Sequence, residues 1–425
     1  MTVEDARSGD RFAPEASTSP VKVAIIGVGG GGSNAVDNMI AAGVRVDTFM
    51  AINTDRQALR LSKAKHRIQI GSKITKGFGA GANHEVGQKA AEESKEMLAN
   101  FIKEKDLIFI TAGMGGGTGT GAAPVVAQVA KELGKLTVAF VTTPFKFEGE
   151  KRMRNAEIGI ANLRKHVDSI IIVPNEQLVN VAQDMTAQEA FRYADDVLRQ
   201  GVQATTDIIL NPGKVNVDFA DLRTVLENGG DSFMGIGRAS GERRAVDAVT
   251  RAVNNPILNV SIEGATQIIV NVEGKDVAIS ELNRAVDLVR EICSPQANII
   301  FGMGFVPALE DEIQITVIAT GFSRPAAAAA NAAALGKPAS VPTTEAQYRQ
   351  APVSHQQPQY APEAQREPFG KPVQQSFFAP QQPQPQPQPR ANAPQPQPAK
   401  QQRDRGYVSL DDDIENSWLK RLNNK

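Results

Sequence analysis

The chain has 425 residues, of which 41% are hydrophobic, and its 46 basic side chains nearly balance its 47 acidic ones. A chain of this length has room for two or three domains, and the balanced charge gives no electrostatic reason to expect a nucleic-acid partner. The single cysteine, Cys293, cannot form an internal disulfide, which is typical of a reducing cytosol. The sequence shows neither a secretory leader nor the ~18 consecutive apolar residues of a membrane span. We therefore expect a cytoplasmic protein that does not insert into a membrane.

The first half of the chain alternates apolar strands with helical patterns. Uniformly apolar strands that alternate with helices predict a parallel sheet covered on both faces. A long helix with apolar residues at i, i+3 and i+4 follows, and a mixed pattern then predicts a smaller α+β domain. We expect strands at about 21–26, 47–52, 107–111, 136–141, 169–173, 266–272, 298–305 and 313–320, and helices at about 33–42, 122–133, 188–210, 241–254 and 277–293.

Composition divides the chain further. More than half of its 25 prolines fall between residues 331 and 405, with almost no aliphatic residue that could build a core. Such a segment cannot offset the entropy of ordering and is expected to be an extended linker. The predicted segments are a disordered arm (1–20), a Rossmann-like domain (21–187), a central helix (188–210), a loop and helix (211–231), an α+β domain (232–323), a disordered Pro/Gln-rich linker (324–408) and a terminal peptide (409–425).

Two glycine-rich loops each lie between an apolar strand and a helix. The first, GVGGGGSN at 27–34, also fits the dinucleotide fingerprint, with Asp47 about 20 residues further on. This loop alone leaves a dinucleotide and a mononucleotide equally open. The second, GMGGGTGTG at 113–121, favours a mononucleotide, because two loops at parallel strand ends can hold one phosphate chain from two sides. The sequence contains no P-loop motif.

The segment GGGTGTG at 115–121 is the signature of the tubulin superfamily. Residues 21–323, with the linker and terminal peptide that follow, resemble the FtsZ family of bacterial tubulin-like cell-division GTPases. The resemblance implies a tubulin-like fold and hydrolysis of GTP to GDP with Mg²⁺. It also implies head-to-tail assembly into the filaments of a division ring at mid-cell.

The resemblance also implies which residues contact GTP, with Asp55 as an indirect partner of Mg²⁺. Some of these have simpler interpretations: the segment 53–55 as a strand-end turn, the segment 79–83 as a flexible surface loop, and Glu148 with Arg152 as an exposed i,i+4 ion pair. The implied contacts are Gly30, Gly31, Gly32, Ser33, Asn34, Asn53, Asp55, Gly79, Ala80, Gly81, Ala82, Asn83, Gly115, Gly116, Gly117, Thr118, Gly119, Thr120, Glu148, Arg152, Phe191 and Asp195.

Phe191 and Asp195 are four residues apart, so a helix places them on one face. A base can stack on Phe191, while the Asp195 carboxylate accepts hydrogen bonds from guanine N1–H and N2–H, a donor pair that adenine lacks. The alternative is a core phenylalanine beside a solvated aspartate. Asn34 is a further candidate for a guanine or sugar contact.

The residues Asn216, Asp218 and Asp221 match the catalytic N-x-D-x-x-D loop of the family. Without the resemblance, Asp218 is also a good helix N-cap and Asp221 suits a first helical turn. The loop follows the far end of a predicted helix of about 23 residues, or roughly 35 Å. The acids therefore do not easily reach the nucleotide of their own chain, and the resemblance implies that they orient water at the nucleotide of the next subunit.

The terminal peptide 409–425 regains apolar residues, and a helix would place four of them on one face: Ile414, Trp418, Leu419 and Leu422. After a disordered tether, such a segment is typical of a peptide that folds on a partner. The resemblance implies membrane-linking division adaptors as that partner. The peptide lacks the proline usual in the family, so the adaptor stays open.

Two other functions compete with a polymerising GTPase. One is an NAD(P)-dependent oxidoreductase, which rests on the loop 27–32 alone and assigns no role to the loop 113–121. The other is a tubulin-like scaffold that binds GTP but hydrolyses it poorly.

Overall fold

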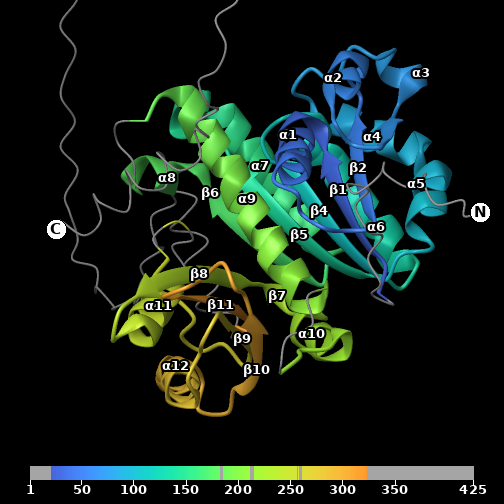
Figure 1. Ribbon diagram of the computed structural model, residues 1–425. Helices are drawn as coiled ribbons and strands as arrows, with labels where there is room; N and C mark the ends of the chain where they lie inside the picture. The colour runs from blue at the N-terminus through green and yellow to red at the C-terminus, as the bar shows by residue number, and fades with distance from the viewer. Residues whose placement is uncertain (1–20, 182–184, 211–214, 256, 258–260, 323–425) are drawn as a thin grey trace, which may run out of the picture. The chain divides into compact units, whose positions relative to one another are not determined.

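The computed structural model describes residues 21–181, 185–210, 215–255, 257 and 261–322 (Figure 1). The predicted N-terminal arm, the Pro/Gln-rich linker and the terminal peptide lie outside the described residues. None of the helices in the described ranges combines the length and the apolar character needed to cross a membrane.

Seven strands form the first sheet in the order β3-β2-β1-β4-β5-β6-β7, and every neighbouring pair is parallel. The central strands are buried along nearly their whole length, as expected for a parallel sheet with both faces covered. The strands are β1 (Val23–Val28), β2 (Thr48–Asn53), β3 (His66–Gln69), β4 (Leu107–Gly113), β5 (Leu136–Thr143), β6 (Ser169–Pro174) and β7 (Gly230–Asp231).

Alternate residues of the central strands enter two separate hydrophobic cores. Ile25 and Phe109 pack in the core that includes α1 and α9, whereas Ile26 and Ile110 pack in the core that includes α4 to α7. This alternation makes three layers, with the sheet in the middle. The helices of this part are α1 (Gly29–Ala41), α2 (Arg56–Leu61), α3 (Ser72–Thr75), α4 (His84–Glu93), α5 (Lys95–Ile102), α6 (Thr118–Glu132), the 3-10 helix η1 (Lys146–Glu148), α7 (Glu150–Leu163), α8 (Asn175–Val181), α9 (Ala187–Leu210) and α10 (Phe219–Leu226).

A second, four-stranded sheet has the order β10-β9-β11-β8. Strand β10 is parallel to β9, while β11 runs antiparallel to both β9 and β8. The sheet carries α11 (Arg244–Val253) and α12 (Ile279–Ile292), which contact each other. Its strands are β8 (Phe233–Ser240), β9 (Gln267–Gly274), β10 (Asn298–Phe305) and β11 (Glu312–Thr320).

Helices α9 and α10 connect the two sheets. Helix α9 has 24 residues, which corresponds to ~36 Å at ~1.5 Å per residue, and it lies across one face of the first sheet in Figure 1. Helix α10 lies at the amino edge of that sheet, because the Ser169 hydroxyl at the start of β6 donates to the Leu226 carbonyl over 2.7 Å. The hydroxyl of Thr320, at the end of β11, donates to the Val225 carbonyl over 2.6 Å.

The predicted fold class is confirmed, but several element boundaries are wrong. Helix α1 begins at Gly29 rather than near residue 33, and α6 begins at Thr118 rather than near residue 122. Glycine and threonine have low helix propensity and therefore predict loops, whereas in the structure each run forms the first turn of its helix. Strands β3 and β8 were not predicted, because β3 is short and polar and β8 contains two glycines.

Candidate functional site

The carboxyl ends of β1, β2, β4 and β5 meet at one edge of the first sheet. Val28, the last residue of β1, pairs with Ile52 on one side and with Ala112 on the other. The loops that follow these strands therefore lie together. They contain most of the residues that the sequence assigns to a nucleotide.

The first turn of α1 packs directly on the end of β4. A Cβ atom on Gly32 would lie 2.2 Å from the carbonyl oxygen of Thr111, so no side chain fits at that position. In contrast, a Cβ on Gly30 or Gly116 would meet no atom within 4 Å. The two glycine-rich loops thus touch at their bases and leave open space above Gly30 and Gly116. The buried hydroxyl of Ser33 has no hydrogen-bond partner within the described part of the chain.

Buried hydroxyl groups hold the second glycine-rich loop in place. The Thr54 and Thr118 hydroxyls lie 2.7 Å apart and share a hydrogen bond, which joins the loop after β2 to the start of α6. The Thr120 hydroxyl accepts a hydrogen bond of 2.8 Å from the backbone N–H of Gly115. Both α6 threonines are buried. They support the loop from beneath, as do the buried Gly117 and Gly119, and the half-buried Gly116 lies on its accessible side.

Asp55 caps helix α2. Its Oδ1 accepts hydrogen bonds from the backbone N–H groups of Gln57 (2.7 Å) and Ala58 (3.3 Å). Its own N–H donates to Oδ1 of the buried Asn53 over 3.2 Å. The strand-end turn that the sequence suggested is therefore present. The second carboxylate oxygen of Asp55 has no hydrogen-bond partner among the described residues.

The loop Gly79–Asn83 lies against the second glycine-rich loop. A Cβ on Gly117 would lie 2.8 Å from Ala80 Cβ, and Asn83 caps α4 by accepting from two backbone N–H groups. Ala82 has a φ of 57°, which is uncommon for a residue other than glycine. Gly81, Ala82 and Asn83 are exposed, so the loop lies at the surface, while Ala80 and Asn83 attach it to the second glycine-rich loop and to α4.

Asn155 on α7 connects two of these loops. Its amide group donates to the carbonyl of Ala82 over 3.2 Å and to the carbonyl of Gly115 over 3.4 Å. The sequence analysis missed this residue because an asparagine inside a helix carries no motif. Its spacing of three residues from Arg152 was the only available signal, since that spacing puts both on one helix face.

Glu148 and Arg152 form the expected i,i+4 ion pair beside the end of β5. Glu148 is largely buried, and it also accepts a hydrogen bond of 3.1 Å from the backbone N–H of Phe145. Arg152 is half exposed, and its backbone carbonyl lies close to Gly115. Although they pair with each other, both residues still lie at the edge of the first sheet where the two glycine-rich loops meet.

Phe191, near the start of α9, lies in an aromatic cluster with Phe145 and Phe147. Phe191 meets Phe145 edge to face at 5.1 Å between ring centroids, and Phe147 at 6.3 Å. Phe145 is buried, but Phe191 remains 43% exposed. The alternative interpretation of Phe191 as a core residue is therefore wrong, and the ring offers an accessible surface beside the loop that follows β5.

Asp195 lies one helical turn further along α9 and is partly buried. It accepts a hydrogen bond of 3.3 Å from the amide of Asn38 on α1. Burial, together with the neighbouring Asp196 carboxylate, raises the pKa of Asp195 to about 7. The alternative of a solvated aspartate is wrong. Asn34 is exposed one turn before Asn38 on α1, so the two asparagines share a helix face.

Asn175 is a second residue that the sequence analysis missed. It follows β6, whose last residue Pro174 pairs with Thr143 of β5, so it lies at the same edge of the sheet. Its side chain is buried, and its amide oxygen has no hydrogen-bond partner among the residues that the structure describes. A buried acceptor without a partner is costly unless a ligand or water satisfies it.

Asn216, Asp218 and Asp221 are not part of this edge. Asp218 Oδ1 accepts from the Asp221 N–H over 2.7 Å, and Asp221 Oδ2 accepts from the Asp218 N–H over 3.3 Å. This reciprocal capping box starts α10, at the amino edge of the sheet. Asn216 and Asp218 are exposed and Asp221 is half buried, so all three are accessible.

The described residues contain no group of three or more His, Cys, Asp or Glu side chains that could hold a metal ion. Mg²⁺ on a nucleotide rarely needs such a group, because phosphate oxygens and water supply most of its ligands. The second carboxylate oxygen of Asp55 fits one water-mediated contact of this kind.

Comparisons with known proteins identify the architecture. Residues 22–183 match the model of the tubulin/FtsZ family, GTPase domain, and residues 230–323 match that of the FtsZ family, C-terminal domain. An empty FtsZ dimer from M. jannaschii is 38% identical over 79% of this chain and 100% of that chain, with a TM-score of 0.69. A single-substitution FtsZ mutant from M. jannaschii is 42% identical over 71% and 91%, with a TM-score of 0.68. CetZ2 from Haloferax volcanii, in a GTPγS-bound protofilament, shares the fold at 20% identity over 74% and 97%, with a TM-score of 0.63.

These matches overturn the oxidoreductase alternative. The glycine-rich loop 27–32 belongs to a GTPase domain, and the second loop, which a dehydrogenase does not need, packs directly against it. The fingerprint was ambiguous because a dinucleotide and a mononucleotide demand the same close backbone approach.

Replacing Asn155 with Ala should weaken nucleotide binding about five- to tenfold, because two hydrogen bonds that position the loops at Ala82 and Gly115 are lost. Titration of a fluorescent GDP analogue measures the change. Asn162→Ala, on the same helix but away from these loops, is the matched control and should bind like the wild type. Equal affinity of the two variants would show that Asn155 does not position the loops.

Proposed function

The chain belongs to the tubulin/FtsZ family of GTPases, and on that premise we propose that it hydrolyses GTP in a site shared between successive copies of itself in a head-to-tail filament. The proposal rests on one observation. The loops that fit the nucleotide and the acids that fit the attacking water lie at opposite edges of the first sheet.

Contacts at the two ends of the sheet support this separation. The glycine-rich loops follow the carboxyl ends of β1 and β4, whereas Leu226 of α10 is bonded to the first residue of β6, at the amino edge. Helix α9 connects the two edges and is ~36 Å long. Asp218 therefore serves a nucleotide only if a second chain brings one to the amino edge.

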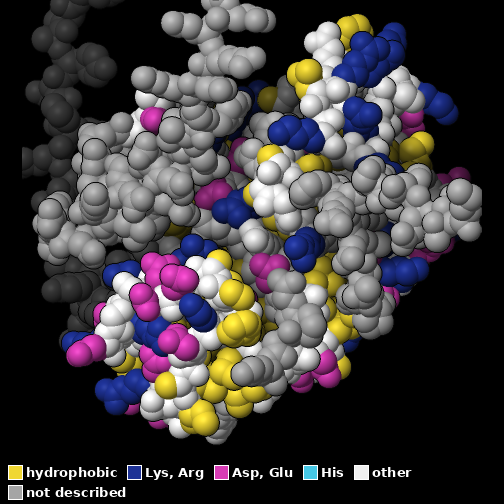
Figure 2. Space-filling view, viewed as in Figure 1, with side chains coloured by type: hydrophobic (Ala, Val, Ile, Leu, Met, Phe, Trp, Pro, Cys, Tyr) yellow, Lys and Arg dark blue, Asp and Glu magenta, His cyan; other side chains and the backbone are white. Residues whose placement is uncertain are grey.

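Both edges expose large apolar side chains beside their half of the site. Leu61 and Phe78 are 83% and 88% exposed, and Phe78 forms a backbone bridge with Asp55. At the other end, Phe301 and Phe305 are exposed on β10, the strand that pairs with the loop before Asp218. Figure 2 shows hydrophobic side chains gathered over this part of the second sheet. Two different surfaces that fit each other make a contact that does not close, so repetition gives a filament. The FtsZ dimer among the similar structures supports this assembly.

At the nucleotide edge, each group has a distinct role in the proposal. The open space above Gly30 and Gly116 accepts the phosphates, where backbone N–H groups of the α1 and α6 first turns and Arg152 stabilise negative charge. Phe191 stacks on the base and Asp195 accepts its N1–H and N2–H. Mg²⁺, bound to the phosphates, would be approached by Asp55 through water and would supply charge neutralisation.

At the other edge, Asp218 and Asp221 position the attacking water. Each uses one carboxylate oxygen in the capping box and keeps the other free of the hydrogen bonds of that box. Phosphoryl transfer depends on positioning and charge stabilisation more than on covalent help. Both acids are present and accessible, so no described residue favours the poorly hydrolysing scaffold.

We further propose that these filaments form the division ring of a bacterial cell and that membrane-linking adaptors bind the terminal peptide. The family match supports this role. The peptide 409–425 lies outside the described residues, so its sequence pattern alone supports adaptor binding.

Deleting 409–425 should leave assembly in solution unchanged and abolish localisation to mid-cell, measured with a fluorescent fusion. Unchanged localisation would exclude the adaptor role.

GTP affinity should depend on the ionisation of Asp195. Its carboxylate accepts from guanine only when ionised, and its pKa of about 7 means that lowering the pH from 8 to 6 protonates most of it. We expect about tenfold weaker nucleotide binding at pH 6 than at pH 8, measured with a fluorescent GDP analogue. Asp196→Asn removes the neighbouring charge and should move the midpoint to lower pH.

The control for this pH dependence is Asp195→Asn. This variant should bind the GDP analogue more weakly than the wild type and should not show the roughly tenfold fall in affinity between pH 8 and pH 6. Protonation of the phosphates changes affinity equally in every variant, so only the difference from Asp195→Asn counts. A difference that does not vary with pH would contradict a guanine contact through an ionised Asp195.

Asp218→Asn separates the catalytic role of Asp218 from its capping role. Asparagine is as good an N-cap as aspartate, so the fold and GTP binding should be unchanged. Phosphate release should fall about 100-fold or more, because the group that polarises water is lost. Mixing the variant with the wild type should also lower the activity of the wild type, since each site needs two chains. A wild-type rate for Asp218→Asn, at any mixing ratio, would exclude the shared site.

A further inference from the structure

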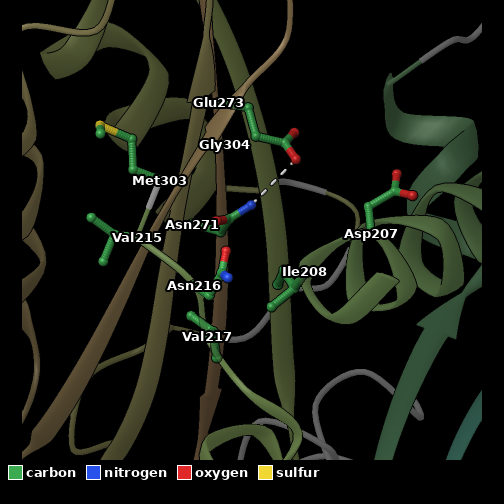
Figure 3. Close-up of a pocket in the computed structure, with 9 residues that line it drawn as sticks. All are labelled: Asp207, Ile208, Val215, Asn216, Val217, Asn271, Glu273, Met303 and Gly304. Carbon is green, nitrogen blue, oxygen red and sulfur yellow. Dashed lines mark hydrogen bonds between the residues drawn. The ribbon is translucent and has the colours of Figure 1, made fainter. Parts of the chain in front are cut away.

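The loop that carries the proposed catalytic acids is bonded to the second sheet. Val215 and Met303 of β10 form an antiparallel bridge, with backbone N–H···O distances of 3.4 and 3.0 Å. Strand β10 is the edge strand of its sheet. The three residues before α10 therefore follow a residue that is bonded to β10. Figure 3 shows Val215 beside Met303, with Asn216 and Val217 following it.

Two residues after this bridge, Val217 packs into a space that Gly302 leaves open. Val217 is only 4% exposed. A Cβ atom on Gly302 would lie 2.9 Å from Val217 Cγ2 and 2.6 Å from Asn271 Oδ1. Both distances are shorter than carbon contacts allow, so at least one neighbour would have to move.

A row of polar side chains restrains Asn271. Its amide donates to Glu273 Oε1 over 3.3 Å, and the Gln314 amide donates to Glu273 Oε2 over 2.6 Å. Arg238 Nε donates to Gln314 Oε1 over 2.6 Å. Gln314 pairs directly with Arg238 on one side and with Glu273 on the other, so the row crosses β8, β11 and β9 in register. Burial raises the pKa of Glu273.

Val217 cannot adapt easily either. A β-branched side chain has restricted χ1 freedom, and the residue is buried between the loop and the second sheet. The polar row limits the movement of Asn271, and a shift of Asn271 would relieve only its own contact with a Cβ at position 302. The contact with Val217 is relieved by a displacement of the Val215–Asp218 backbone. That displacement would carry Asp218 with it.

We propose that Gly302 is a positioning residue for GTP hydrolysis: the space it leaves lets Val217 pack beside Asn271 and so places Asp218 at the neighbouring subunit's nucleotide. The proposal rests on the shared site described above. Gly302 acts through Val217 and touches no substrate.

The test is Gly302→Ala in the full chain. Phosphate release at saturating protein and GTP should fall about 10- to 100-fold, because small misplacements of a catalytic group have effects of this size. Binding of a fluorescent GDP analogue and pelleting with a slowly hydrolysed GTP analogue should stay within twofold of the wild type. Loss of pelleting would overturn the proposal, because the substitution would then act on the subunit contact.

A double variant tests the route through Val217. Val217→Ala removes the methyl groups that the new Cβ would meet, so Gly302→Ala with Val217→Ala should release phosphate at least about fivefold faster than Gly302→Ala alone. Additive effects of the two substitutions would show that Gly302 does not act through Val217 and would overturn the proposal.

Gly304→Ala is the matched control, two residues along the same strand. The three atoms nearest its Cβ would all belong to Glu273, the closest at 3.1 Å, and none to Val217. A shift of a few tenths of an ångström relieves this contact, so hydrolysis should stay within twofold of the wild type. Equal losses of phosphate release in Gly302→Ala and Gly304→Ala would indicate a general weakening of β10 and would overturn the specific role of Gly302. If Asp218→Asn loses turnover while Gly302→Ala does not, the shared site stands and the positioning role fails.

Discussion

The parallel arrangement of the first sheet is the constraint on which the rest of the structure depends. Parallel strands end at one edge, so the loops after β1, β2, β4 and β5 are brought together without any further contact. Helix α9 then crosses the sheet and delivers the chain to the opposite edge, where α10 is bonded to the first residue of β6. No change of rotamer closes a separation of this size. If the acids at α10 act on a nucleotide, their dependence on a second chain is a consequence of the topology and needs no separate regulatory element.

At the nucleotide edge, the structure separates residues that form a surface from residues that support it. Gly32 is needed because the backbone of β4 passes too close for a side chain, whereas Gly30 faces open space. The Thr118 hydroxyl shares a hydrogen bond with the Thr54 hydroxyl, and the Thr120 hydroxyl accepts one from the backbone N–H of Gly115. A phosphate-binding loop must hold its N–H groups in fixed directions before the ligand arrives, and these buried bonds supply that rigidity. The motif GGGTGTG therefore specifies the support of the loop as much as its contact surface.

The sheet, the long helix and the second domain could be predicted because their apolar residues repeat with a clear period, which one sequence is enough to show. The sequence placed the starts of α1 and α6 wrongly, because local propensity disfavours glycine in helices while the close packing on β4 demands it. The residues of the candidate site were assigned through the resemblance of their motifs to a known family. Three asparagines were not predicted, because no motif marks them and their roles depend on the groups that the fold brings near them: Asn38, Asn155 and Asn175. The raised pKa of Asp195 is of the same kind, since it needs burial and Asp196 together.

The second sheet contributes rigidity to a loop that belongs to neither domain alone. Burying the carboxylate of Glu273 is unfavourable, and an apolar side chain at that position would stabilise the fold at least as well. What a polar row adds is direction: Arg238, Gln314 and Glu273 fix the amide of Asn271, whereas an apolar contact at that position would allow sliding. Helix α12 is fixed to α11 in the same manner, because Arg244 bonds to Glu281 over 2.7 Å and to Asp276 over 3.2 Å. Val215 and Val217 contact the second sheet through β10. In the proposed mechanism the second sheet therefore helps to position the catalytic acids, although the helix that delivers them packs on the first.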